Sequence, residues 1–171
     1  MFILETARLR LRELTTSDGE FMLALLNDPD FIRHVGDRGV RTLEGAREYI
    51  VKGPMQSYAR NGFGLYMVEL SGTREKLGIC GLVKREGLTD IDIGFGFLPQ
   101  YRSQGYAIEA ATAVMAQARD ELELGRVVAI TSQDNERSAN VLLKLGLKFE
   151  KMITFPGEEK EIRLYAWNRP S

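Results

Sequence analysis

The sequence has few of the residues that build disulfides and metal sites. Its 171 residues include one cysteine, Cys80, and one histidine, His34. A single cysteine excludes an internal disulfide and a multi-thiolate metal site, and a single histidine excludes zinc sites that need several imidazoles. We therefore expect no metal, and a Ser/His/Asp triad would have to use His34.

An excess of one charge and long hydrophobic runs are also absent. The 23 Lys and Arg residues oppose 24 Asp and Glu residues, for a formal net charge of -1. Binding to nucleic acid or to an anionic membrane depends on many clustered cations, so neither partner is expected. No apolar stretch approaches the roughly 20 residues of a membrane helix, and no signal peptide is visible. We expect a cytoplasmic protein with a single domain over residues 1–171.

What the chain does contain is a regular succession of strand and helix patterns. Alternating or β-branched runs predict strands, and apolar stripes with cap residues predict helices. The expected strands are 8–14, 64–70, 77–85, 90–98, 127–131, 147–153 and 161–167. Helices are expected after Thr15–Asp18 as far as Asp28, from Thr42 to Asn61 with a break at Gly53–Pro54, and over 105–122 and 136–145. Short spacers predict antiparallel hairpins, and the order indicates a mixed α/β sheet with helices on its faces.

The segment from Asp92 to Ala107 combines a glycine-bearing strand with the start of the clearest helix. Gly94 and Gly96 share one face of the strand, which often marks close approach of a ligand or another backbone. Pro99 ends the pairing of the strand. The loop Arg102–Ala107 (Arg-Ser-Gln-Gly-Tyr-Ala) then enters the helix, where unpaired amides and the helix dipole can bind a phosphate or pyrophosphate.

These residues resemble the acetyl-CoA loop of the GNAT N-acetyltransferases, whose core pattern is [QR]-x-x-G-x-[GA]. Asn135–Ser138 resembles the start of the N-x-x-S helix of that family. The expected helix ends at Gly146, and the next residue is Leu147, where the family usually has Phe. The N-terminal part of the chain resembles the opening of the RimJ/RimL branch of ribosomal-protein N-acetyltransferases at Glu5–Arg12, Asp18 and Asp28–Pro29.

The resemblance implies an α/β (α+β) GNAT fold: a mixed, mostly antiparallel sheet of about seven strands, with one splayed parallel pair and helices on both faces. It also implies acetyl-CoA as co-substrate. The implied cofactor-binding residues are Gly96, Phe97 and Leu98 on the pantetheine and thioester, Arg102, Ser103, Gln104, Gly105, Tyr106 and Ala107 on the pyrophosphate, and Asn135 on the pantetheine amide. The implied catalytic residues are Ser138, as donor to the departing thiolate, and Asp92, as base directly or through water.

Each of these side chains also has a structural interpretation. Asp92 could be a solvated strand residue, and Ser138 could cap or pack its helix. Glu109 is more consistent with a structural hydrogen bond than with catalysis, and Cys80 with a small buried residue than with a nucleophile. His34 is expected at the surface, near the acceptor pocket of the family.

Three functional hypotheses are consistent with these residues. The leading hypothesis is acetyl transfer from acetyl-CoA to a primary amine by direct attack in a ternary complex. The alternatives are a non-catalytic domain that senses acyl-CoA and an unrelated phosphate-binding module. The acceptor would be a protein N-terminus or a small amine, and the chain a monomer or a homodimer. The acceptor region, 27–62 and 153–162, has mixed charges that select neither a cationic nor an anionic acceptor: Asp28, Asp30, Arg33, Asp37, Arg38 and Arg41.

Overall fold

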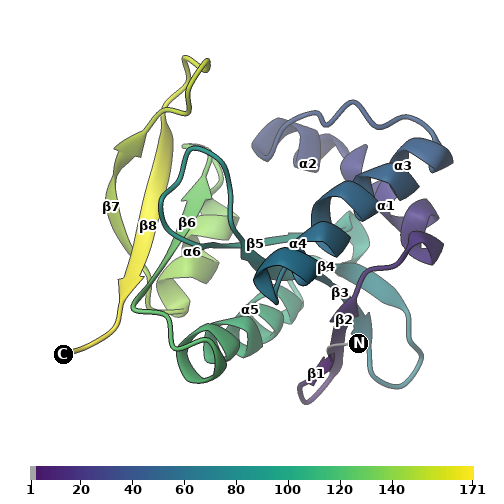
Figure 1. The fold of residues 1–171 in the computed structure, drawn as a ribbon, viewed down its shortest axis with the longest axis horizontal. Coiled ribbons are helices and arrows are strands. Elements are labelled where there is room, and N and C mark those ends of the chain that lie inside the picture. The colour runs from purple at the N-terminus through teal and green to yellow at the C-terminus, as the bar shows by residue number, and fades with distance from the viewer. Residues whose placement is uncertain (1–2) are drawn as a thin grey trace.

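A computed structural model describes residues 3–171 and shows one eight-stranded sheet, in the order β1-β2-β3-β4-β5-β6-β8-β7 (Figure 1). The strands are β1 (Ile3–Glu5), β2 (Leu9–Glu13), β3 (Leu65–Leu70), β4 (Lys76–Val83), β5 (Asp92–Phe97), β6 (Arg126–Thr131), β7 (Lys148–Ile153) and β8 (Ile162–Asn168). All neighbours are antiparallel except β5 and β6, which are parallel. The predicted mixed sheet and its hairpins are confirmed, with eight strands where seven were expected. The short β1 was missed.

The helices are α1 (Gly19–Leu26), α2 (Pro29–His34), α3 (Leu43–Ile50), α4 (Gln56–Asn61), α5 (Tyr106–Ala116) and α6 (Glu136–Lys144). Sequence patterns missed α2, because Asp28–Pro29 was interpreted only as the end of the preceding helix. Asp28 in fact caps α2 by accepting a hydrogen bond from the Phe31 amide, with Pro29 in its first turn, a common way for a helix to begin. The expected break at Gly53–Pro54 is a π-helical turn, Val51–Met55, between α3 and α4.

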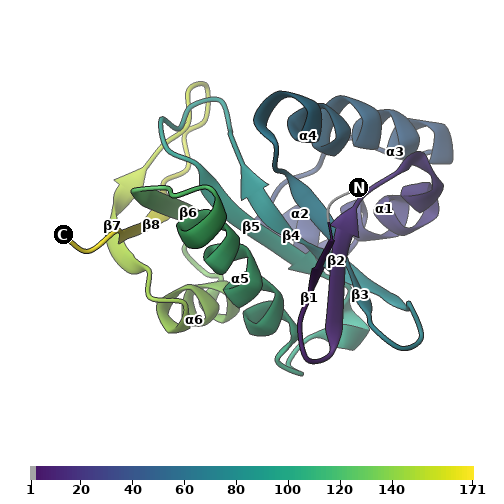
Figure 2. The same cartoon turned by 60° about the horizontal axis from the view of Figure 1, so that its bottom comes forward.

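Two hydrophobic clusters cover the two faces of the sheet. One joins α5 and α6 to the sheet through residues such as Val114, Leu142 and Cys80. The other joins α1, α2 and α3 to Met67 and Ile79 on the opposite face. Figure 2 shows α5 on one side and α1 and α3 on the other. Helices on both faces, as expected, leave the middle of the sheet enclosed.

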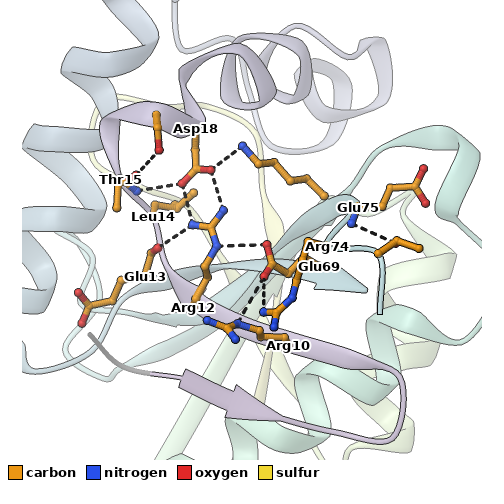
Figure 3. A network of polar contacts seen from close by, with 12 residues as sticks. Arg10, Arg12, Glu13, Leu14, Thr15, Asp18, Glu69, Arg74 and Glu75 are labelled. Atoms are coloured by element: carbon orange, nitrogen blue, oxygen red, sulfur yellow. Dashed lines mark hydrogen bonds and ion pairs between the residues drawn. The ribbon is translucent and has the colours of Figure 1, made fainter. Parts of the chain in front are cut away.

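A buried network of charged side chains links β2 and β3 to the start of α1 (Figure 3). Asp18 is fully buried and pairs with Arg12 at 2.9 Å and with Lys76 at 2.7 Å. Arg12 also reaches Glu69 at 3.1 Å. These pairs supply the hydrogen bonds that buried charges need.

Candidate active site

The sheet opens between β5 and β6. The only register pair between these strands is Asp92 with Val128, and beyond it they diverge. A cleft of about 900 Å³ enters this gap. It is lined by β5, by β6 and the residues after it, by α6, and by segments around α2 and α4. The structure therefore provides the splayed parallel pair that the sequence resemblance implied.

Asp92 is the buried carboxylate of this cleft. Its side chain is 1% exposed, and its Oδ2 lies 3.4 Å from Nη2 of Arg85. Its Oδ1 has no hydrogen-bond partner within residues 3–171. Burial raises the pKa of Asp92, and the nearby Arg85 only partly opposes that rise. The alternative of a solvated strand residue is therefore wrong, while a role as base stays a prediction.

Ser138 and Asn135 line the same cleft from the start of α6, which follows β6. Asn135 caps α6, since its Oδ1 accepts a hydrogen bond of 3.2 Å from the Ser138 amide. The Ser138 hydroxyl makes no hydrogen bond within the described residues and is half-buried. The amide of Ser138 thus belongs to the cap, and its hydroxyl is available to a ligand.

Backbone groups along β5 alternate between its two neighbours. The Leu98 amide donates to the Leu77 carbonyl at 3.1 Å, whereas the Ile91 carbonyl accepts from the Val128 amide at 3.0 Å. Continuing the alternation, the groups of Gly96 face β4 and those of Phe97 face the gap. This favours Phe97 over Gly96 and Leu98 as the position whose amide meets a pantetheine arm.

The loop 102–107 leads from the end of β5 into α5. Gly105 has φ +83° and Ser103 has φ +62°, so the backbone turns sharply just before the helix starts at Tyr106. The first amides of α5, including those of Tyr106 and Ala107, lie at a helix N-terminus, which suits an anion. Gln104 is exposed and donates to the Gln100 carbonyl.

Arg102 does not contribute its charge to this loop. Its guanidinium pairs with Asp28 and Asp30, both at 2.7 Å, and donates to the Phe97 carbonyl at 3.1 Å. The side chain therefore ties the end of β5 and the loop to α2. With its guanidinium held by these carboxylates, Arg102 has its backbone amide left for the expected contact with the pyrophosphate.

Two contacts across the gap were missed by sequence reasoning. From α2, Arg33 pairs with Asp134 at 2.6 Å, and His34 Nδ1 lies 2.8 Å from the Ser132 hydroxyl. Asp134 and Ser132 follow β6. No local signal connects these residues, because they are about 100 positions apart and meet only through the topology of the sheet. His34 is half-buried in the cleft wall and not simply at the surface.

Two other candidates prove structural. Cys80 is fully buried, and burial raises the pKa of its thiol far above the ordinary value, which disfavours a nucleophilic thiolate. Glu109 accepts hydrogen bonds from the Thr6 hydroxyl and the Arg8 amide and pairs with Arg8 at 2.7 Å. It thereby holds the turn between β1 and β2 against α5, as its structural interpretation predicted.

Metal-ligating and membrane-spanning features are lacking in residues 3–171. No group of three or more His, Cys, Asp or Glu side chains is placed to hold a metal ion. Nor does any helix of this range have the length and apolar character needed to cross a membrane.

Comparison with known proteins agrees with this geometry. Residues 8–148 match the family described as Acetyltransferase (GNAT) domain. The Bacillus subtilis (strain 168) protein YkkB is 31% identical over 170 residues, covering 98% of this chain and 91% of YkkB. A GNAT-family acetyltransferase structure from Bacillus anthracis is 27% identical, with a TM-score of 0.81 and 98% of each chain covered. RimL, a ribosomal L7/L12 alpha-N-protein acetyltransferase solved in complex with coenzyme A, has the same fold, with a TM-score of 0.81, 98% of each chain covered and 18% identity. This chain therefore belongs to the GNAT acetyltransferase family.

Proposed function

We propose that this chain transfers the acetyl group of acetyl-CoA to a primary amine, by direct attack of the amine within a ternary complex. The observation that carries the proposal is the cleft between β5 and β6, which is lined both by a buried carboxylate, Asp92, and by an available hydroxyl, Ser138. Because the chain belongs to an acetyltransferase family, we assign the carboxylate and the hydroxyl to acetyl transfer. Members of this family use acetyl-CoA.

In this proposal Asp92 is the base. An ordinary lysine-like amine has a pKa near 10.4 and is protonated at neutral pH, so it must lose a proton before its nitrogen can attack the acetyl carbonyl. Asp92 accepts that proton through its unpartnered Oδ1, directly or through a water molecule. A raised pKa suits this role, because proton transfer is most efficient when the pKa of the base lies near the working pH.

Ser138 is the donor to the leaving thiolate. An ordinary thiol has a pKa near 8.5, so its thiolate leaves more readily when a hydrogen bond stabilises the charge. The Ser138 hydroxyl lines the same cleft as Asp92 and has no competing partner in the described part of the chain. In this proposal the base, Asp92, and the hydrogen-bond donor to the thiolate, Ser138, are two different side chains of the cleft.

Acetyl-CoA would be held by backbone groups. The Phe97 amide faces the gap and suits the pantetheine arm. The amides of residues 102–107, with Gly105 in the left-handed region, suit the pyrophosphate. We assign Asn135 to the pantetheine amide, because it lines the same cleft. A Cβ added at Gly94 would contact only Leu65, at 3.9 Å, whereas one added at Gly96 would contact the Phe31 ring at 3.5 Å. This face of β5 therefore has room for a co-substrate at Gly94 and is covered by α2 at Gly96.

We extend the proposal to a protein N-terminus as acceptor, by analogy with the RimL structure. Action in the cytoplasm, a single domain over residues 1–171, and a monomeric or homodimeric state stay predictions from the sequence. Size-exclusion chromatography with light scattering would measure the oligomeric state directly.

The test is release of coenzyme A thiol from acetyl-CoA in the presence of a broad amine panel that includes N-terminal peptides. We expect release that depends on the acceptor, and a thermal midpoint raised by acetyl-CoA more than by ATP or NAD. A raised midpoint without acceptor-dependent thiol release would instead support the non-catalytic acyl-CoA-binding alternative. A larger shift with ATP or NAD would support a different phosphate-binding module.

A further inference from the structure

The ion pair between Arg85 and Asp92 is incomplete. It consists of one contact of 3.4 Å, and two buried atoms of the pair, Nε of Arg85 and Oδ1 of Asp92, have no hydrogen-bond partner within residues 3–171. Buried polar atoms without partners are rare and costly. Both residues line the cleft, so a bound ligand could satisfy both atoms if it supplied an oxygen acceptor beside an amine donor.

The aspartates that the sequence analysis named in the acceptor region are all held in ion pairs with arginines. Asp28 and Asp30 are bound by Arg102, and Asp37 is bound by Arg41. All three aspartates named for the acceptor region are thus paired, as are Arg33 and Arg41 of the same set, which leaves Arg38 without a carboxylate partner in the described chain. The mixed charge read from the sequence is therefore not the charge that an acceptor would meet.

Unpaired cations exceed unpaired carboxylates on the wall of the cleft. Four cationic side chains of the wall have no carboxylate partner in the described chain: Arg38, Arg60, Lys84 and Lys160. Two wall carboxylates, Glu86 and Glu158, are likewise unpaired. The loop proposed for the pyrophosphate, 102–107, is not part of this wall. The positive excess therefore lies where the acceptor would enter.

We propose that the acceptor is an amine that carries a carboxylate close to its nitrogen. Nε of Arg85 binds the carboxylate, Oδ1 of Asp92 takes the ammonium, and the unpaired cations attract the negative charge. The inference rests on the proposed acetyl transfer. A free acidic amino acid and the N-terminus of an acidic peptide both supply this chemistry, whereas a cationic polyamine would be repelled.

The experiment compares matched acceptors in the thiol-release assay. The small acceptors are glutamate, glutaminamide, which has amides in place of both carboxylates, and putrescine. The peptides differ only in having Glu-Glu, Gln-Gln or Lys-Lys after the first residue. We expect kcat/KM to be roughly tenfold higher for the acidic member than for the neutral one, and lower again for the cationic one. Whether the amino acid or the peptide is preferred identifies the source of the carboxylate.

Variants then test the assigned residue. Arg85→Gln should bring the acidic-to-neutral ratio of kcat/KM close to one. Because both acceptors use Asp92, any effect of the substitution on the base cancels in that ratio. Lys84→Gln should lower the ratio in part. Lys148→Gln removes the same charge from an exposed position of β7 outside the cleft. This substitution should leave the acidic-to-neutral ratio of kcat/KM unchanged.

Two results would overturn the inference while acetyl transfer stands. One is a wild-type enzyme that acetylates neutral or cationic acceptors as well as acidic ones. The other is an acidic-to-neutral ratio that survives Arg85→Gln. If no acceptor releases thiol although acetyl-CoA raises the thermal midpoint, the proposed function itself fails and this inference with it.

Discussion

Asp92 owes its chemical character to its buried position at the first residue of β5, between β4 and β6 and beside Arg85. Burial favours the protonated carboxyl and raises the pKa, and Arg85 acts in the opposite direction. If Asp92 is the base, activity requires the ionised form. Activity should therefore rise with pH through the raised pKa and be lost below it.

The corresponding variant is Asp92→Asn. We expect it to lower kcat by roughly 10² to 10⁴ and to remove the acidic limb of the pH profile, because no carboxylate remains to titrate. The thermal shift caused by acetyl-CoA should persist. Asp90→Asn is the matched control, since Asp90 lies two residues away and pairs with Arg126. An Asp92→Asn enzyme with wild-type kcat and pH dependence would exclude Asp92 as the base.

Asp18 provides a prediction about stability. Burial works to raise its pKa, but hydrogen bonds from Arg12 and Lys76 outweigh burial and lower the pKa to about 2. Because the folded-state pKa lies below the unfolded value near 3.9, this stabilisation is fully present above pH ~4 and is lost as the pH falls toward 2.

We expect Asp18→Asn to lower the free energy of unfolding at neutral pH by about 3 kcal/mol, because it leaves the buried Arg12 with fewer partners. Urea denaturation between pH 2 and pH 7 measures both the loss and its pH dependence. Asp37→Asn removes an exposed partner of Arg41 and should leave the urea midpoint nearly unchanged. Equal effects of the two substitutions would contradict the importance of the buried network.

At the scale of elements, the turn before α5 controls how the loop 102–107 presents its amides. Gly105→Ala places a side chain at φ +83°, where an L residue costs about 1–2 kcal/mol. The loop should relax away from its conformation, and the Kd for acetyl-CoA should rise roughly tenfold. Isothermal titration calorimetry measures this directly.

The control is Gly146→Ala, at φ +95° after α6, where an added Cβ meets nothing within 4 Å. It carries a similar backbone cost outside the loop, so it should lower stability without changing the Kd. If both substitutions leave the Kd unchanged, the loop does not bind the cofactor as proposed.

Most elements could be predicted because their patterns are local. The alternation in β2 and the long apolar stripe of α5 each depend on residues within one segment. The two elements that the sequence did not predict, α2 and β1, have ambiguous or very short patterns. Asp28–Pro29 both ends one helix and begins another, and β1 has three residues. The glycines of β4 show the same limit, since a Cβ at Gly81 would lie 2.0 Å from the Gly64 carbonyl oxygen. That requirement comes from the residue before β3 and cannot be inferred from the sequence of β4.

At the scale of the whole molecule, the candidate site is made by topology. Resemblance to a family could nominate Asp92, Asn135 and Ser138, and the splay of β5 from β6 places all three around one cleft. The resemblance did not include Arg85, which reaches Asp92 across the β4–β5 hairpin. It also could not reveal that Arg102 binds α2, because that contact joins residues more than 70 positions apart. The charge that an acceptor meets therefore follows from the assembled fold and not from the composition of one region.

The central claim is that acetyl-CoA donates its acetyl group to an amine in this cleft. Its most direct test is to measure, by mass spectrometry and thiol assay in the same reaction, acetylated amine and released coenzyme A. The account predicts one acetylated amine for each coenzyme A released, with both products strongly reduced by Asp92→Asn. Coenzyme A released without acetylated amine, or acetylation at an undiminished rate in Asp92→Asn, would contradict it.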